Sequence, residues 1–450
     1  MDIRAAAEMI GKREFALLKT ELREMMPADI AELLTELYRS EENFGEKDLS
    51  LLFRILPKDT AADVFTFLDT DLQKVLINAF SESELREVLD DLFLDDTVDI
   101  IEEMPANVVS RILKAADPQK RRQINELLNY PEDSAGSIMT TEFVYFKDDD
   151  TVSECMARIR SVGLVKETVY TCYVTRRRRL VGTISLLDLL VADKTEQVGS
   201  IMDTSFVSVH VHDDQEDVSR LAARHDLAAV PVVDDENRIV GIITFDDVMD
   251  VMADESAEDI AKMGAVAPQE DSYFETSVWS HVKSRIGWLL VLMISATLTG
   301  FITNRFEAQI AAVPLLVAFM PMLTDTGGNC GSQSAAMVIQ GMALDEIVTG
   351  DFFKVIKKEL AISLICAAIL AAVNFTRIML FYHNIMIATV VSLTLICTVV
   401  LSKLIGASLP MLAKRLKQDP AVMSAPLLST VVDSLSTLIY FTIATRLLRL

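Results

Sequence analysis

The pattern of hydrophobic and polar positions changes abruptly near residue 275 of this 450-residue chain. Over the first 130 residues, apolar side chains recur at spacings of three and four, which predicts short amphipathic helices. Pro27, Pro57 and Pro105 each stand where one of these helices begins, and proline is favoured there because a first-turn amide has no partner. The repeated pattern predicts an α-helical superhelical domain over 1–130, with a plain helical bundle as the alternative.

An internal duplication follows the helical segment. Ile138-Met139-Thr140-Thr141 opens one unit, Ile201-Met202-Asp203-Thr204 opens the next, and both close with β-rich segments, at 180–188 and 239–247. Each unit has the order strand, helix, two strands, helix. This order and the repeated motifs resemble a tandem pair of CBS domains, which is an α/β fold. We therefore expect CBS units at 131–198 and 199–255.

The CBS resemblance implies a nucleotide site as well as a fold. Ser185 and Asp188 stand at positions where CBS domains can hold a ribose, as do Thr244 and Asp247 in the second unit. The resemblance implies an adenine nucleotide such as ATP as a modulator, with Tyr170 and Asp188 as binding residues. A purely structural CBS pair is the alternative.

A strongly acidic connecting helix is expected next, over 246–275. It contains no Lys or Arg before Lys262, while Asp247, Asp250 and Asp254 are spaced by three and four and share one face. Like charges at this spacing destabilise an isolated helix. The sequence therefore favours a divalent cation as the partner of this face over simple solvation.

The apolar part of the chain, 276–450, is predicted to cross a membrane. Its apolar runs suffice for five helical spans, since about 20 residues cross a bilayer. The expected spans are 283–304, 312–341, 357–379, 385–410 and 420–447. Eight Lys and Arg residues lie on the N-terminal side of these spans and four on the other, so the positive-inside rule places the N-terminal domains in the cytosol. In a multi-pass protein of the cell (inner) membrane, the odd number of spans then leaves the C-terminus outside.

The second expected span contains an unusual segment. Pro314 and Pro321 are followed by three glycines, and such breaks survive in lipid only where the backbone faces protein or water. Asp325, Gly328 and Asn329 belong to a polar group that favours the lining of a wet pathway. Close helix packing through the glycines is the alternative.

A polar stripe also follows one face of the fifth expected span. Ser424, Thr430 and Asp433 belong to it, and Asp419 precedes it. A carboxylate at the centre of a bilayer costs about 2.5–3.5 kcal/mol on insertion scales, so Asp433 is expected to have a function. Two copies of Asp433 around a dimer axis would offer two carboxylates to a hydrated dication, whereas a protonated structural Asp is the alternative.

Charge and cysteine content narrow the functional classes. The first 275 residues carry 29 Lys or Arg and 58 Asp or Glu, and this acidic surface argues against nucleic-acid binding. The five cysteines are scattered without a C-x-x-C, which indicates neither a disulfide framework nor a zinc site. Since the chain has no phosphate-binding loop motif and its five histidines form no constellation, an enzyme is not expected.

Together these residues resemble the MgtE family of magnesium channels, which is related to the eukaryotic solute carrier family 41. The likeness covers the whole chain, and its most specific parts are 314–334 and the pattern from Asp419 to Asp433. It implies a homodimer in the lipid bilayer, a Mg²⁺ pore between the subunits, and closure by intracellular Mg²⁺. It also implies metal-binding positions, namely Asp433 in the pore, Asp419 near its cytosolic mouth, and Asp59, Asp91, Asp95, Gly136, Ala223, Asp226, Asp247, Asp250, Glu255, Glu258 and Asp259 in the gate.

The hypothesis that follows is a Mg²⁺ channel shut by Mg²⁺ ions bound between the acidic N-domain, CBS and connecting-helix surfaces. Cys330 stands where the family is expected to have a small residue such as Ala, which is a minor departure. Two alternatives stay open. One is a transporter of another divalent cation, such as Mn²⁺ or Co²⁺, and the other is a membrane-tethered nucleotide and Mg²⁺ sensor without transport.

Overall fold

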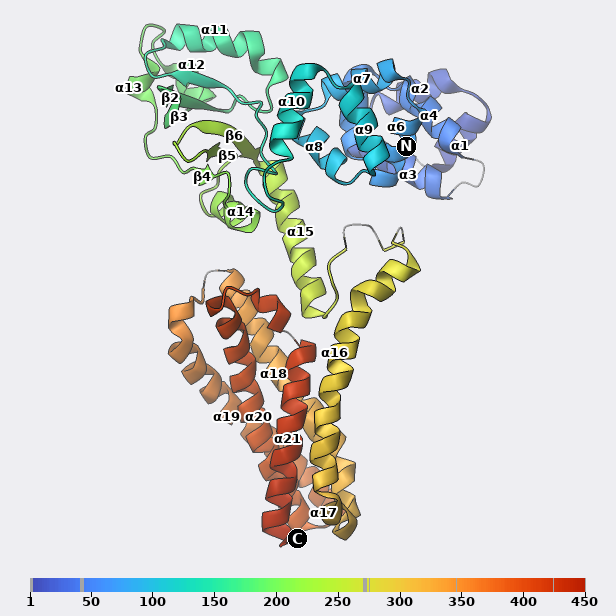
Figure 1. Ribbon diagram of the computed structural model, residues 1–450, viewed down its shortest axis with the longest axis vertical. Coiled ribbons are helices and arrows are strands. Elements are labelled where there is room, and N and C mark those ends of the chain that lie inside the picture. Colours follow the sequence, from blue (N-terminus) through green and yellow to red (C-terminus); the bar gives the residue numbers. More distant parts are fainter. Residues whose placement is uncertain are drawn as a thin grey trace. The chain divides into compact units, whose positions relative to one another are not determined.

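The structure is a computed structural model that describes residues 3–40, 44–269, 273–274, 276–344, 346–423 and 425–449. It divides into two compact units, Met1–Met252 and Ala253–Leu450. The first unit holds a helical N domain and two small sheets, and the second holds long apolar helices (Figure 1).

Short helices build the N domain. They are α1 (Ile3–Gly11), α2 (Phe15–Leu22), α3 (Pro27–Ser40), α4 (Glu46–Ile55), α5 (Lys58–Thr66), α6 (Thr70–Ala79), α7 (Glu82–Asp91), α8 (Leu94–Glu102), α9 (Ala106–Ala115) and α10 (Pro118–Leu127). The proline prediction is confirmed, because α3 begins at Pro27 while Pro57 and Pro105 directly precede α5 and α9. The buried faces of these helices form one hydrophobic core that continues into the second CBS unit through Val218 and Ile243. The N domain and this CBS unit are therefore packed together.

Two three-stranded sheets follow the N domain. The first CBS unit contains β1 (Tyr145–Lys147), α11 (Val152–Val162), the 3-10 turn η1 (Gly163–Val165), β2 (Thr171–Arg176), β3 (Arg179–Ser185) and α12 (Leu186–Val191). The helix α13 (Val198–Ile201) follows and packs against β1 and β3 of the first unit. The second unit contains β4 (Val209–His210), α14 (Gln215–Arg224), β5 (Ala229–Val233), β6 (Ile239–Thr244) and α15 (Phe245–Met263). In both sheets the first two strands pair in parallel and the last two pair antiparallel. The predicted order of strand, helix, two strands and helix is confirmed in both units.

The acidic helix α15 is shorter than the sequence predicted. It begins with Asp246 and Asp247 in its first turn, where negative charge suits the positive end of the helix dipole. It ends at Met263 rather than near residue 275, and the described residues 264–269 are not helical. Ala265 adopts a left-handed φ of 55°, and Pro268 cannot continue a helix, which accounts for the early end.

The second unit consists of long helices joined by short turns. They are α16 (Val278–Arg305), α17 (Glu307–Ala312), the 3-10 turn η2 (Pro314–Phe319), α18 (Met320–Ala343), the turn η3 (Thr349–Asp351), α19 (Phe352–Tyr382), α20 (Ile385–Arg415), the turn η4 (Pro420–Met423) and α21 (Ala425–Leu448). Among the described residues, four segments are long and apolar enough to cross a membrane: α16, α21 with η4, α20, and α19 with η3.

The second expected span, 312–341, differs most from its prediction. The structure divides it among the end of α17, the turn η2 and the helix α18. Within the described residues α18 is not among the helices whose hydropathy suffices for a span, because Asp325, Asn329 and Gln333 interrupt its apolar sequence. At 1.5 Å per residue its length of about 36 Å nevertheless matches a bilayer. A five-helix transmembrane domain therefore stays a prediction.

Glycines allow α18 to pack closely against α20 and α21 (Figure 1). A Cβ atom on Gly406 of α20 would lie 2.2 Å from the carbonyl oxygen of Gly331 in α18. A Cβ atom on Gly327 would lie 2.8 Å from Val432 of α21. The packing alternative thus accounts for the glycine face of α18, while Asp325, Asn329 and Gln333 occupy another, exposed face.

Candidate functional site

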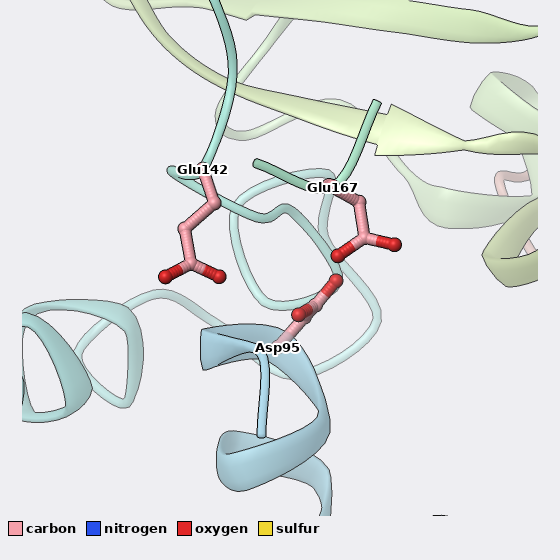
Figure 2. A group of neighbouring side chains, drawn as sticks. All are labelled: Asp95, Glu142 and Glu167. Atoms are coloured by element: carbon pink, nitrogen blue, oxygen red, sulfur yellow. The ribbon is translucent and has the colours of Figure 1, made fainter. Parts of the chain in front are cut away.

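Three carboxylates from distant segments meet in the first unit. Asp95 lies in the first turn of α8, whereas Glu142 and Glu167 lie in loops of the first CBS unit, and Figure 2 shows the three side chains converging. One oxygen of each lies within 4.8 Å of the others. Two hydrogen bonds from backbone amides hold the group together. The Leu94 amide donates to Glu142 Oε2 at 3.2 Å, and the Glu167 amide donates to the Glu142 carbonyl at 2.9 Å. This carboxylate centre joins the N domain to the first CBS unit.

The carboxylate centre contains buried acceptors that have no hydrogen-bond partner among the described residues. Asp95 is only 6% exposed, and no described residue donates a hydrogen bond to its buried Oδ1 atom. Glu167 Oε2 is in the same condition. A buried charge without a partner is strongly unfavourable, and a bound cation would neutralise the negative charge of these carboxylates.

The pKa values of the three carboxyls are raised, which indicates that negative charge is unfavourable in this centre. Burial, followed by repulsion from Asp247 and Asp96, raises the pKa of Asp95 well above its usual range. Burial, followed by repulsion from Asp96 and Asp247, raises the pKa of Glu167 to about 8. Burial also raises the pKa of Glu142, although the nearby Lys120 partly offsets this effect. A dication that displaced the protons would relieve all three carboxylates together.

Asp247 connects this centre to the start of α15. Burial raises the pKa of Asp247 to about 6, although hydrogen bonds from the Thr244 hydroxyl and amide lower it. Those two bonds are 2.6 and 3.1 Å long and cap the first turn of α15. Asp247 is therefore held in place beside the three carboxylates. Hard oxygen ligands of this kind suit Mg²⁺, Mn²⁺ or Ca²⁺.

The remaining predicted gate residues differ from one another in their exposure and in the elements on which they lie. Asp91, Ala223 and Asp226 are exposed, and Gly136 is buried with its amide bonded to the Val211 carbonyl at 2.9 Å. The side chain of Asp59 lies outside the described residues. Asp250, Glu255 and Asp259 lie along α15. Within the described part of the chain, no second group of three ligand-type side chains meets at comparable distances.

Lys262 brings together two other predicted metal ligands. Its Nζ atom lies 2.8 Å from Glu258 and 2.7 Å from Asp419, so one ammonium bridges the end of α15 and the start of η4. Partial burial lowers the pKa of Lys262, but the hydrogen bonds to Asp419 and Glu258 outweigh burial and raise it. The chain therefore supplies its own cation between these two carboxylates.

The predicted pore residues gather on α18 and α21. Asp325 and Asn329 are exposed on one stripe of α18, and Asn329 Nδ2 donates to Asp325 Oδ2 at 3.2 Å. Asp433 on α21 is half-buried and lies near enough to Asp325 for the two carboxylates to interact. Gly328 differs from its predicted role, since it is buried and a Cβ atom there would lie 3.1 Å from the hydroxyl of Ser429.

Thr430 and Ser424 are the other two predicted pore residues of the fifth expected span. The Thr430 hydroxyl donates to the Pro426 carbonyl of its own helix at 2.8 Å, which satisfies it locally. Ser424 lies outside the described residues. The structure thus places Asp325 and Asp433 near one another, and the pore-lining roles of all these residues stay predictions.

The predicted nucleotide residues also have local roles. Tyr170 is 74% exposed, which leaves its ring available to stack on a base. Asp188 Oδ2 accepts the Ser185 hydroxyl at 2.6 Å, and the Ser185 hydroxyl accepts the Asp188 amide at 3.0 Å. This capping box explains the Ser-x-x-Asp motif by helix capping alone, so the motif is no specific sign of a ribose site.

Sequence reasoning missed Glu142, Glu167 and Lys262. Glu142 and Glu167 are single acidic residues in loops, and only the packing of the N domain on the CBS unit brings them to Asp95. Lys262 did carry a signal, because it is the first cation after the acidic stretch of α15.

Comparison with known families divides the chain as the structure does. Residues 25–133 match the model of the MgtE intracellular N domain, residues 135–194 and 198–254 match CBS domains, and residues 320–443 match the MgtE divalent cation transporter model. The solved cytosolic domain of the Mg²⁺ channel MgtE in complex with ATP is 34% identical, with a TM-score of 0.51 that covers 56% of this chain and all of that one.

Full-length relatives extend the match across the whole sequence. The magnesium transporter MgtE of Thermus thermophilus is 35% identical over 446 residues, which are 98% of this chain and 97% of the relative. The magnesium transporter MgtE of Bacillus subtilis is 30% identical over 95% of this chain and 93% of its own. With its matches to the MgtE N domain, the CBS domain and the divalent cation transporter models, and with its apolar helices, this chain is a membrane protein that belongs to the MgtE family.

Proposed function

We propose that this chain is a homodimeric Mg²⁺ channel or transporter that takes Mg²⁺ into the cytosol, and that Mg²⁺ bound at the carboxylate centre favours its closed state. The observation that carries the transport proposal is the exposed pair of Asp325 and Asn329 on α18, beside Asp433 on α21. Relatives named as magnesium transporters supply the choice of ion.

The polar stripe of α18 requires a partner in a bilayer. Asp325, Asn329 and Gln333 recur every four residues and are exposed in the single chain. Lipid offers no hydrogen bonds to such side chains, so they must face water or another protein surface. A second copy of the chain, related by a twofold axis, would turn this stripe into the lining of a wet path between subunits.

Such a dimer would supply the path with four carboxylates, two each of Asp325 and Asp433. Mg²⁺ gives up its water shell reluctantly and usually keeps several waters when it binds carboxylates. Carboxylates that hold the ion through its waters therefore suit Mg²⁺ better than a tight cage of direct ligands. In this proposal Asp433 carries the permeation site, and Asn329 orients Asp325.

The carboxylate centre suits a Mg²⁺ sensor because its members come from different domains. When Mg²⁺ is scarce, repulsion among Asp95, Glu142, Glu167 and Asp247 favours separation of the N domain from the CBS unit. When Mg²⁺ is abundant, these carboxylates are held together, and α15 is held with them through Asp247. A switch from 1:99 to 99:1 needs about 10⁴-fold differential affinity, which several weak sites can supply jointly.

The topology and the nucleotide role are also part of the proposal. The acidic domains lie in the cytosol and the C-terminus lies outside, as the distribution of Lys and Arg favours. ATP stacks on Tyr170 in the first CBS unit and strengthens domain closure. The related cytosolic domain of the Mg²⁺ channel MgtE was solved in complex with ATP, which supports nucleotide binding by the corresponding part of this chain.

The test is cation flux into liposomes that contain the full-length protein and a Mg²⁺-sensitive dye. The proposal expects flux when the cytosolic face is in low Mg²⁺ and a decrease as Mg²⁺ on that face rises. Flux of Mn²⁺ or Co²⁺ without Mg²⁺ would favour transport of another cation. Absence of flux, together with Mg²⁺ binding to the cytosolic domains, would favour a sensor that does not transport.

A further inference from the structure

A buried lysine lies within the apolar part of α20. Lys403 is only 6% exposed, and the helix continues for about 18 Å beyond it before ending at Arg415. A charged side chain inside a membrane bundle is retained only when it is paired or has a function. The transport proposal gives Lys403 no role, so its partners need an explanation.

Lys403 is paired through a serine with a carboxylate on a third helix. Its Nζ atom donates to Ser334 Oγ of α18 at 3.3 Å, and Ser334 Oγ donates to Glu359 Oε2 of α19 at 2.7 Å. Ser334 is 1% exposed and Glu359 is half-buried. The hydroxyl therefore links one positive and one negative charge, and the network connects α18, α19 and α20.

The neighbouring contacts seal this network. Val338 lies one turn after Ser334 in α18, and Ala407 lies one turn after Lys403 in α20. Both belong to an apolar cluster that Val355 and Ile356 of α19 complete. Gly331, three residues before Ser334 in α18, meets Gly406, three residues after Lys403 in α20, so the two backbones approach closely beside the network. The three polar groups thus lie in a closely packed junction where water cannot easily replace their bonds.

Ser334 lies on the side of α18 opposite the exposed stripe. It follows Asp325 by nine residues, or about two and a half helical turns, which is half a rotation about the helix axis. A side chain that is bonded on one face of a helix fixes the direction in which the opposite face points. The Lys403 network is therefore placed to set the direction of Asp325 and Asn329.

We propose that Lys403, acting through Ser334 and Glu359, is a positioning residue that fixes the rotation of α18 and so aims Asp325 and Asn329 into the permeation path. This inference rests on the transport proposal for the same path. Loss of the network would leave Asp325 and Asp433 unchanged in chemistry and would alter only their alignment.

The first experiment measures Mg²⁺ flux of full-length variants in liposomes. Ser334→Ala removes the linking hydroxyl without changing any charge, and Lys403→Met removes the ammonium from a side chain of similar length. Both are expected to lower flux about tenfold or more, which is the effect of losing groups that orient ligands. Lys414→Met is the control, because it removes the same charge from an exposed position on the same helix.

A double variant separates positioning from charge balance. Lys403→Met with Glu359→Gln leaves no net charge in the junction, so a role limited to neutralising Glu359 predicts full recovery of flux. The positioning role predicts that flux stays low although the protein assembles. Recovery to the parent level would overturn the proposal, as would parent-level flux in Ser334→Ala.

The second experiment reports the direction of α18 without relying on transport rate. In a background without native cysteines, single cysteines replace residues 324–333 in turn and are treated with a charged, water-soluble thiol reagent. The parent should label best at 325, 329 and 333, and this pattern should shift around the helix when Ser334→Ala is added. An unchanged pattern would overturn the inference. A parent that neither labels on this stripe nor transports would remove the transport proposal itself, and the inference falls with it.

Discussion

The carboxylate centre makes a quantitative prediction for Glu167→Gln. The pKa of Glu167 rises from 4.5 to about 8 in the folded protein, mainly through burial and then through repulsion from Asp96 and Asp247. At about 1.4 kcal/mol per pH unit, this difference corresponds to at most about 5 kcal/mol of folding free energy. Since solvent reaches the half-buried carboxyl, we expect the measurable effect to be about 1–3 kcal/mol.

The sign follows from which state binds the proton more tightly. The folded pKa lies above the unfolded one, so the stabilisation by the protonated carboxyl is complete below pH 4.5 and is lost as the pH rises through about 8. Without Mg²⁺, the parent should therefore lose stability between pH 5 and 8, and Glu167→Gln should lose less. Binding of Mg²⁺ at a hundred times its Kd would stabilise the parent by about 2.7 kcal/mol at pH 8.

The assay is the unfolding temperature of the cytosolic transition in the full-length protein in detergent, at pH 6 and 8, with EDTA or Mg²⁺. One kcal/mol shifts the melting temperature of a unit of this size by about 2–4 °C. Glu167→Gln should be the more stable variant at pH 8 in EDTA and should gain less from Mg²⁺ than the parent. Glu196→Gln, an exposed carboxyl of the same CBS unit, is the control. Equal stabilisation of Glu167→Gln and the parent by Mg²⁺ would refute the centre as a Mg²⁺ site.

Three further predictions concern the gate and the membrane helices. Asp247→Asn combined with Asp250→Asn should give a channel that cytosolic Mg²⁺ inhibits poorly, measured as flux against Mg²⁺ concentration; unchanged inhibition would contradict the sensor. Lys262→Met should weaken the contact between α15 and η4, and a double-mutant cycle with Asp419→Asn should give a coupling of about 0.2–1 kcal/mol in detergent unfolding, since both side chains are partly exposed. Gly406→Ala would place a Cβ atom 2.2 Å from a carbonyl oxygen and should destabilise the helix packing by about 1–3 kcal/mol, seen as a lower melting temperature; an unaffected melting temperature would argue against this contact.

Local sequence patterns were sufficient to predict much of the fold. The prolines at 27, 57 and 105 mark helix starts because first-turn geometry depends on neighbouring residues alone. The duplicated strand and helix order of the CBS units was predictable for the same reason. The length of α15 was not, because its end depends on the left-handed conformation of Ala265, a residue that seldom adopts it.

The candidate sites were predictable only where one residue stood out from its surroundings. Asp433 is conspicuous as a carboxylate in an apolar run, and Asp325 follows two prolines. Glu142 and Glu167 look like ordinary loop residues, and their meeting with Asp95 depends on contacts between domains. The partners of Lys403 lie on two other helices, so its network appears only when α18, α19 and α20 are packed together.

The most direct test of the transport account is Mg²⁺ flux through Asp433→Asn compared with the parent, in liposomes with low Mg²⁺ on the cytosolic face. Asp351→Asn, which changes a partly exposed carboxyl just before α19, serves as the matched control. The account predicts flux in the parent and the control, and none in Asp433→Asn that assembles like the parent. Equal flux in Asp433→Asn and the parent would contradict the assignment of Asp433 to the permeation path.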